Sequence, residues 1–151
     1  MLVMPEFLKY NFRRVEENAD FIDLQLTYFK ENWILGLQDE YIIFNVFDFK
    51  DELMAIVAFE YIRDPFQLNL QLLEVIPKHR GQKIAQVILA FGLELHRKIV
   101  PDDIKHASLI IESKSSARDY YRKLGAVELE SDRFFFPQTE AEQLIQRVKN
   151  L

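Results

Sequence analysis

The chain contains no cysteine among its 151 residues, which excludes a disulfide framework, a thiolate metal site and a cysteine nucleophile. No apolar run approaches the ~20 residues that a membrane-spanning helix requires. The start of the chain has no basic segment followed by an apolar run, so we expect no signal peptide and a cytoplasmic protein. No linker rich in glycine, serine or proline and no internal repeat is present. We therefore expect one domain over residues 1–151.

The charge balance is acidic, with a formal net charge of −5. This argues against nucleic acid as the main partner, because such proteins present basic surfaces, and it is compatible with a cationic amine substrate. The three histidines, His79, His96 and His106, lack metal-ligand spacing, so no metal is expected. Nearly half of the residues (49%) are apolar and thirteen are Phe, which is enough for a full core at a length that buries roughly 70% of the unfolded surface.

Residue periodicity predicts an alternation of strands and helices. Two β-branched and aromatic runs, 41–49 and 53–61, flank a short polar turn and predict a hairpin. Capping-box spacing of Ser116 with Asp119 predicts where a later helix begins, and Gly125 ends it. The predicted strands are 8–15, 41–49, 53–61, 68–76, 106–112, 127–129 and 133–136, and the predicted helices are 18–29, 82–99, 116–125 and 139–151.

The last predicted helix, 139–151, has a capping-box pair in Thr139 and Glu142. One of its faces is apolar and is formed by Ala141, Leu144, Ile145, Val148 and Leu151. So short a helix needs packing to be stable in water. We expect this face to be buried within the same chain, with a homodimer contact as the alternative.

The segment 72–85 takes an apolar strand through a short basic loop directly into the first turn of an amphipathic helix. Such a loop directs unpaired backbone N–H groups outward at the positive end of the helix dipole, which suits a phosphate. The alternative is an ordinary strand-to-helix turn with solvated basic side chains. The spacing Arg80-x-x-Lys83-x-Ala85, preceded by Val75-x-Pro77, resembles the Arg/Gln-x-x-Gly-x-Gly/Ala element of the GNAT superfamily of N-acetyltransferases.

A second segment, Ser116 to Ala126 with Lys114 ahead of it, is similar to the Asn-x-x-Ala-x-x-(Leu/Phe)-Tyr-x-Lys-x-Gly-Phe segment of the same family. Two motifs in the right order on the right elements are far more specific than one. The resemblance implies an α/β GNAT-like fold over residues 8–136, a mixed, mostly antiparallel sheet flanked by helices, with 139–151 as an additional helix. Lys83 replaces a glycine of the family pattern, and Lys114 and Ala126 also depart from it.

The resemblance implies an acetyl-CoA-dependent N-acetyltransferase that transfers acetyl to a primary amine by direct attack in a ternary complex. The family's fourth and fifth strands splay apart, so that the thioester carbonyl bonds a strand N–H near Val75 or Ile76. The residues implied in cofactor binding are Val75, Ile76, Arg80, Gly81, Gln82, Lys83, Ile84, Ala85, Lys114 and Ala117. No metal is implied.

Tyr121 occupies the family's tyrosine position, which implies a general acid that returns a proton to the CoA thiolate. It could instead be a core aromatic; Tyr120 is the alternative acid and is expected to pack. Among carboxylates for the general base, Glu74 is favoured because it lies on the strand beside the thioester, with Glu60 and Glu112 as alternatives, and a water chain remains a further option.

Two other readings compete with the enzyme. A catalytically degenerate CoA-binding or protein-interaction domain of the same fold would explain Lys83 and the absence of an evident base. A plain α/β interaction module would bind no CoA. The sequence does not identify the acceptor amine.

Overall fold

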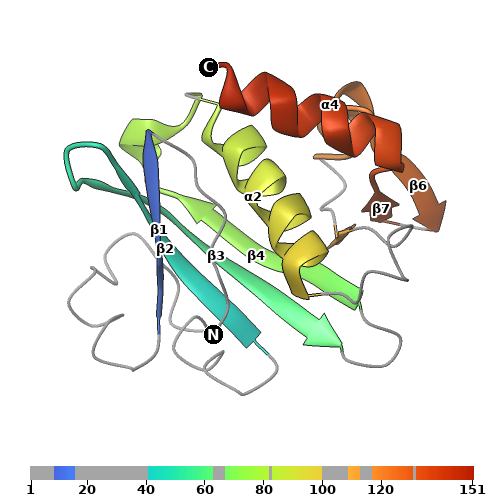
Figure 1. Ribbon diagram of the computed structural model, residues 1–151, viewed down its shortest axis with the longest axis horizontal. Helices are drawn as coiled ribbons and strands as arrows, with labels where there is room; N and C mark the ends of the chain where they lie inside the picture. The colour runs from blue at the N-terminus through green and yellow to red at the C-terminus, as the bar shows by residue number, and fades with distance from the viewer. Residues whose placement is uncertain are drawn as a thin grey trace.

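The computed structural model describes residues 9–15, 41–62, 67–81, 83–99, 109–112, 117–130 and 132–151. In these ranges seven strands form one sheet in the order β1-β2-β3-β4-β5-β7-β6 (Figure 1). All neighbours are antiparallel except β4 and β5, which run parallel. The strands are β1 Tyr10–Arg14, β2 Tyr41–Asp48, β3 Leu53–Ile62, β4 Gln67–Val75, β5 Ile110–Glu112, β6 Val127–Glu130 and β7 Arg133–Phe135. This is the predicted mixed, mostly antiparallel sheet.

The helices of the described part are α2 Ile84–Ile99, α3 Arg118–Lys123 and α4 Gln138–Lys149, with a 3-10 turn, η2, at Pro77–His79. Figure 1 shows α2 lying across one face of the sheet and α4 beside α2. No helix in the described ranges is both long and apolar enough to cross a membrane.

We call the face of the sheet under α2 the first face and the opposite one the second face. Strand alternation assigns side chains to them. On β3, Val57 and Phe59 belong to the large core with α2, whereas Ile56 and Ala58 belong to a separate apolar cluster on the second face. A β-bulge at Gln71 shifts the β3–β4 register between Ala58 and Phe59. Both faces are therefore apolar near the middle of the sheet.

Gly92 sets how closely α2 approaches the sheet. A Cβ at this position would lie 2.8 Å from Cε1 of Phe59 and 2.9 Å from Cδ2 of Leu109. Phe91, next to it, stacks on Phe12 with ring centroids 3.8 Å apart and meets Phe44 edge to face. The helix α2 thus packs against the strands through the aromatic ring of Phe91 and through the backbone of Gly92, which has no side chain.

The tail helix packs within the chain, as predicted. Ala141, Leu144, Ile145 and Val148 are buried, α4 contacts α2, and Glu142 pairs with Arg97 of α2. Leu151, expected on the same buried face, is instead exposed because it lies beyond the end of the helix. The predicted capping box is wrong, because the N-cap residue is Pro137 with no side-chain cap and Thr139 already lies in the helix.

Other observed boundaries differ from the predicted ones by one to four residues, and some predicted boundaries lie outside the described residues. The helix α2 begins at Ile84 and not at Gln82, and β5 begins at Ile110, with Leu109 outside it. The N-cap of α3 is Ala117, without a side-chain cap, so the predicted cap one residue earlier does not set the start of this helix. The predicted helix 18–29, residues 106–108 and Ser116 lie outside the described residues.

Candidate functional site

The strands β4 and β5 pair only briefly. Asn69 lies opposite Ile110 and Leu70 opposite Ile111, and there the pairing ends. Strand β4 continues along β3 as far as Val75, which lies opposite Ala55. Beyond Leu70, therefore, the backbone of β4 has a partner strand on one side only within the described part of the chain. Within the described residues the pairing of β4 with β5 therefore stops where the expected divergence of the fourth and fifth strands would begin.

The pairing with β3 decides which backbone groups face the divergence. The N–H of Ile76 donates to the carbonyl of Met54 at 2.8 Å, so it is already occupied by β3. Because successive peptide groups of a strand point in opposite directions, the N–H groups of Val75 and Leu73 point away from β3, toward the open side. Of the two donors expected from the sequence, Val75 is available and Ile76 is not. Leu73 is a further donor that the sequence did not indicate.

The strand then runs through η2 into the loop before α2. The side chain of Arg80 folds back along the loop, and its Nε donates to the carbonyl of Val75 at 3.2 Å. Gly81 has a φ of +85°, and its Cα faces open space. Arg80, Gly81 and Lys83 are all exposed. The loop thus exposes a guanidinium, an ammonium and an unobstructed stretch of backbone.

The first turn of α2 supplies the donors for an anion. Its first intrahelical bond runs from the N–H of Val87 to the carbonyl of Lys83, which leaves the N–H groups of Ile84, Ala85 and Gln86 without an acceptor in the helix. No acidic residue lies in this first turn. The positive end of the helix dipole is therefore not neutralised from within the helix, as a phosphate site requires.

Lys83 has a φ of +60°. A side chain in this left-handed region costs roughly 1–2 kcal/mol, a cost that glycine avoids. The position where the family pattern has glycine therefore requires a left-handed backbone conformation. In this chain a lysine adopts that conformation, with strain. The strain also explains why α2 begins after Lys83.

A small ion-pair cluster holds η2 against the β2–β3 hairpin. Glu52 bonds Lys78, and its Oε1 lies 3.6 Å from Nε2 of His79, which is only 4% exposed. The hydrogen bond from Lys78 lowers the pKa of the Glu52 carboxyl. His79 is buried beneath the turn and helps to anchor it.

Tyr120 and Tyr121 occupy neighbouring positions on α3, with ring centroids 5.7 Å apart. Tyr121 packs against the large core and lies 5.9 Å from the ring of Phe134. Tyr120 is more exposed, at 37%, and a hydrogen bond links it to Gln86 in the first turn of α2. The expectation that Tyr120 is the one that packs is wrong, because the helix turns Tyr121 toward the core.

Burial raises the pKa of the Tyr121 phenol, and the adjacent Tyr120 raises it further. Burial also raises the pKa of Tyr120, partly offset by its hydrogen bond with Gln86. Both hydroxyls are therefore protonated at neutral pH and able to donate.

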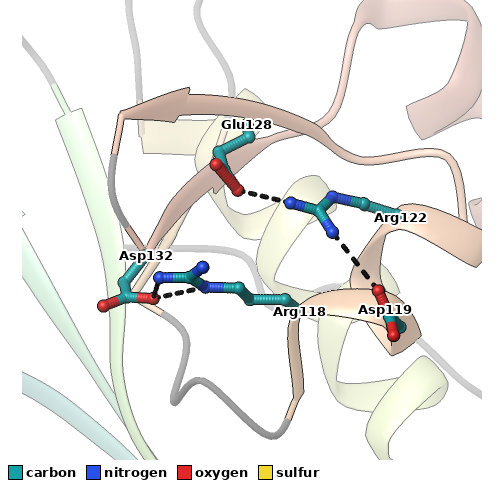
Figure 2. Close-up of polar contacts among 5 residues, drawn as sticks. All are labelled: Arg118, Asp119, Arg122, Glu128 and Asp132. Atoms are coloured by element: carbon teal, nitrogen blue, oxygen red, sulfur yellow. Dashed lines mark hydrogen bonds and ion pairs between the residues drawn. The ribbon is translucent and has the colours of Figure 1, made fainter.

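Two arginines fix α3 against the β6–β7 hairpin, as Figure 2 shows. Arg118 donates from Nε to Oδ1 of Asp132 at 2.6 Å and pairs with the same oxygen through Nη2. Arg122 bridges Glu128, at 2.8 Å, and Asp119, at 3.2 Å. Because these contacts lie on both sides of the two tyrosines in sequence, they hold the short helix, which buries little of its own surface, in one orientation.

Comparison with solved structures identifies this architecture. The spermidine N-acetyltransferase SpeG of Vibrio cholerae, solved as a point mutant, superposes with a TM-score of 0.64 at 13% identity, over 89% of this chain and 96% of that one. AtaTR bound with AcCoA gives 0.65 at 16% identity, over 90% and 98%, and the KacTA–DNA complex gives 0.66 at 14%, over 92% and 99%. The chain has the GNAT fold. No protein-family model and no curated protein sequence matches it.

Within the GNAT fold, the candidate bases occupy different places. Glu74 precedes Val75 and lies opposite Ile56, on the second face. Glu60 lies opposite Asn69 and five residues along β3 from Ala55, the partner of Val75, which corresponds to roughly 17 Å along the strand. That is too far for direct proton transfer beside Val75. Glu112 lies at the end of β5, opposite Arg133.

The remaining expected cofactor residues divide into two groups. Ala117 is described, is half-buried and caps α3, so it lies at the start of the tyrosine helix. Gln82 and Lys114 lie outside the described residues. Among the residues that the structure does describe, no three His, Asp or Glu side chains are grouped so that they could hold a metal ion.

Proposed function

We propose that this protein is an acetyl-CoA-dependent N-acetyltransferase that acts on a primary amine. One observation carries the proposal. The open edge of β4, with the N–H groups of Leu73 and Val75, leads directly into a loop with Arg80 and the unneutralised first turn of α2. A pantetheine arm can add to a strand edge through backbone hydrogen bonds, while its pyrophosphate meets the helix end. The comparison structures, one of them bound with AcCoA, support this use of the fold.

In this proposal Arg80, Gly81, Lys83, Ile84 and Ala85 hold the pyrophosphate, with Gln82, Lys114 and Ala117 contributing as the family resemblance implies. The N–H of Val75 or Leu73 polarises the thioester carbonyl and stabilises the oxyanion that develops there. The cofactor is acetyl-CoA as co-substrate, with no metal in the reaction.

The transfer is direct. The acceptor ammonium first loses a proton, either to Glu74 or to a water that Glu74 activates. The amine nitrogen attacks the thioester carbonyl carbon and a C–N bond forms. The nitrogen then gives its excess proton to solvent and the C–S bond breaks, and solvent restores the proton that the tyrosine donates to the thiolate. The departing thiolate takes a proton from a tyrosine hydroxyl, for which Tyr121 is the first candidate and Tyr120 the second. The products are an amide and free CoA.

Two measurements test the proposal. Acetyl-CoA should raise the melting temperature, because a ligand that binds only the folded state stabilises it in proportion to RT ln(1 + [L]/Kd). Thiol release should then appear in the presence of primary amines and not in their absence. No thermal shift at millimolar acetyl-CoA would remove the assignment of the loop.

The second candidate, a CoA-binding domain without catalysis, is favoured by the strained Lys83 at the family's glycine position. It predicts the thermal shift without thiol release from any amine. The two measurements together therefore separate the enzyme, the degenerate domain and a module that binds no CoA.

A further inference from the structure

The helix that carries the two tyrosines, α3, has little apolar surface of its own to hold it in place. It is six residues long, and none of its residues is buried. A helix this short is not stable by itself in water, so neighbouring elements must fix its orientation. Tyr121, the first candidate for the acid, is the side chain through which α3 packs against the large core. The position of its phenol therefore depends on the polar contacts that hold the rest of the helix.

Two arginines of α3 supply these contacts, and both reach to the β6–β7 hairpin (Figure 2). Nε of Arg118 donates to Oδ1 of Asp132 at 2.6 Å, and Nη2 of Arg118 pairs with the same oxygen. Arg122 donates to Glu128 at 2.8 Å. The two arginines are four residues apart and therefore lie on one face of the helix. Two attachments one turn apart on one face resist rotation of α3 about its own axis.

Asp132 is also the turn residue of this hairpin. Its φ is +64°, in the left-handed region that glycine and asparagine favour and that aspartate tolerates. Glycine or asparagine would therefore suit the turn, but neither would give Arg118 an ionised partner. The turn itself does not need the carboxylate of Asp132, and that carboxylate binds α3.

The same hairpin also meets the ring of Tyr121. Phe134 of β7 is fully buried, and its ring lies 5.9 Å from the ring of Tyr121. The guanidinium carbon of Arg122 lies 5.8 Å from the centroid of that Phe134 ring, within the range of a cation–π contact. The hairpin thus supplies both an apolar surface beside the tyrosine and the carboxylates that hold the helix on which the tyrosine lies.

We propose that Asp132 is a positioning residue for the acid of the acetyl transfer. Through Arg118 it sets the orientation of α3, and thereby the place of the tyrosine hydroxyl beside the departing thiolate. This rests on the proposed function and adds to it a residue that acts through Arg118 and not on the substrates. A misplacement of about 1 Å can cost roughly 10²-fold in rate. Loss of the anchor should therefore lower turnover, while the proposed pyrophosphate site at the start of α2 still binds acetyl-CoA.

The first test uses substitutions that suit the turn. Asp132→Gly removes the carboxylate and should lower kcat for thiol release by roughly tenfold or more, with little change in the Kd of acetyl-CoA. Asp132→Asn keeps an acceptor oxygen without the charge, so its kcat should fall between. Glu130→Gln removes a carboxylate of the same hairpin whose partner is Arg133 and not α3, and should leave kcat unchanged. Melting temperatures show whether each variant is folded, and Asp132→Asn replaces Asp132→Gly below if the latter is not.

A double-mutant cycle separates positioning of the acid from a general disturbance of the site. Asp132→Gly is combined with Tyr121→Phe, or with Tyr120→Phe should that variant lose more turnover. Without the hydroxyl its orientation no longer matters, so Asp132→Gly should lower kcat little further in that background. A full, additive loss there, or an unchanged kcat in Asp132→Gly alone, overturns the inference and leaves the acetyltransferase intact. Absence of thiol release from the wild-type protein with every primary amine would instead remove the proposed function, and this inference with it.

Discussion

The guanidinium of Arg80 is tied to the strand that precedes it, because its Nε donates to the carbonyl of Val75 at 3.2 Å. This bond fixes the loop that follows β4 to the carbonyl of Val75, which lies on the open edge of β4. It uses Nε and leaves both terminal nitrogens of Arg80 for a ligand. The thioester end and the pyrophosphate end of the proposed CoA site are thus linked through one side chain.

Replacing Arg80 with lysine should weaken acetyl-CoA binding by roughly tenfold, because a lysine cannot both hold the Val75 carbonyl and form a fork with a phosphate. Isothermal titration of acetyl-CoA measures the change. Arg97→Lys, on the exposed side of α2 at its ion pair with Glu142, is the matched control and should bind normally. Equal affinity in the two variants would place the pyrophosphate elsewhere.

Substitutions of Lys83 can separate the strain of its left-handed backbone from the contribution of its ammonium group to acetyl-CoA binding. Lys83→Gly removes the left-handed strain of roughly 1–2 kcal/mol, less the extra flexibility that glycine gives the unfolded chain. We expect it to be at least as stable as the wild-type protein in urea unfolding and to bind acetyl-CoA more tightly, since the backbone becomes accessible. Lys83→Ala keeps the Cβ and the strain while losing the ammonium. If Lys83→Gly binds as weakly as Lys83→Ala, the ammonium matters more than the backbone.

The tyrosines are distinguished by their effects on turnover. Tyr121→Phe should lower kcat by roughly 10²–10⁴-fold with little change in acetyl-CoA affinity, because only the proton donor is lost. Tyr120→Phe, which removes the bond to Gln86, should act mainly on affinity. Should the larger loss of kcat follow Tyr120→Phe, the acid is the more exposed tyrosine.

The pH profile offers an independent check of the same acid. Burial raises the pKa of Tyr121, so the phenol stays protonated to higher pH than an exposed tyrosine. The alkaline decline of kcat in the wild-type protein should therefore begin above the ordinary tyrosine range. In Tyr121→Phe this limb should disappear. A limb that persists unchanged would belong to another group.

The order of the elements along the chain and the hairpins follow from sequence because apolar periodicity and turn residues are local signals. The sequence does not reveal which backbone N–H groups of β4 are open to a ligand. That depends on the register against β3, in which the carbonyl of Met54 accepts the N–H of Ile76. The same holds for the bulge at Gln71, which brings Gln71 to Glu60. Backbone geometry also sets two helix starts that the sequence does not predict: the left-handed Lys83 precedes α2, and Pro137 is the N-cap of α4 in place of the predicted capping box.

Gly92 illustrates a requirement of packing that opposes local propensity. Alanine is the better helix former by about 1 kcal/mol, yet its Cβ would lie under 3.0 Å from Phe59 and Leu109. We expect Gly92→Ala to lower the free energy of unfolding by roughly 1–3 kcal/mol, as overpacking does. Lys98→Ala, on the exposed part of the same helix, should be neutral. A stabilised Gly92→Ala would mean that α2 does not pack as closely as its contacts indicate.

The tail helix supports the proposed site indirectly, because α4 packs against α2, and the first turn of α2 is the proposed phosphate-binding turn. Leu144 is fully buried, whereas Leu151 at the chain end is 40% exposed. Leu144→Ala should therefore cost roughly 2–5 kcal/mol of unfolding free energy, through lost transfer energy and the cavity left behind, and Leu151→Ala well under 1 kcal/mol. Urea unfolding measures both, and light scattering follows the molar mass. If Leu144→Ala destabilised the fold only at protein concentrations where the wild type associates, the apolar face of α4 would be an interface between copies and not an internal contact.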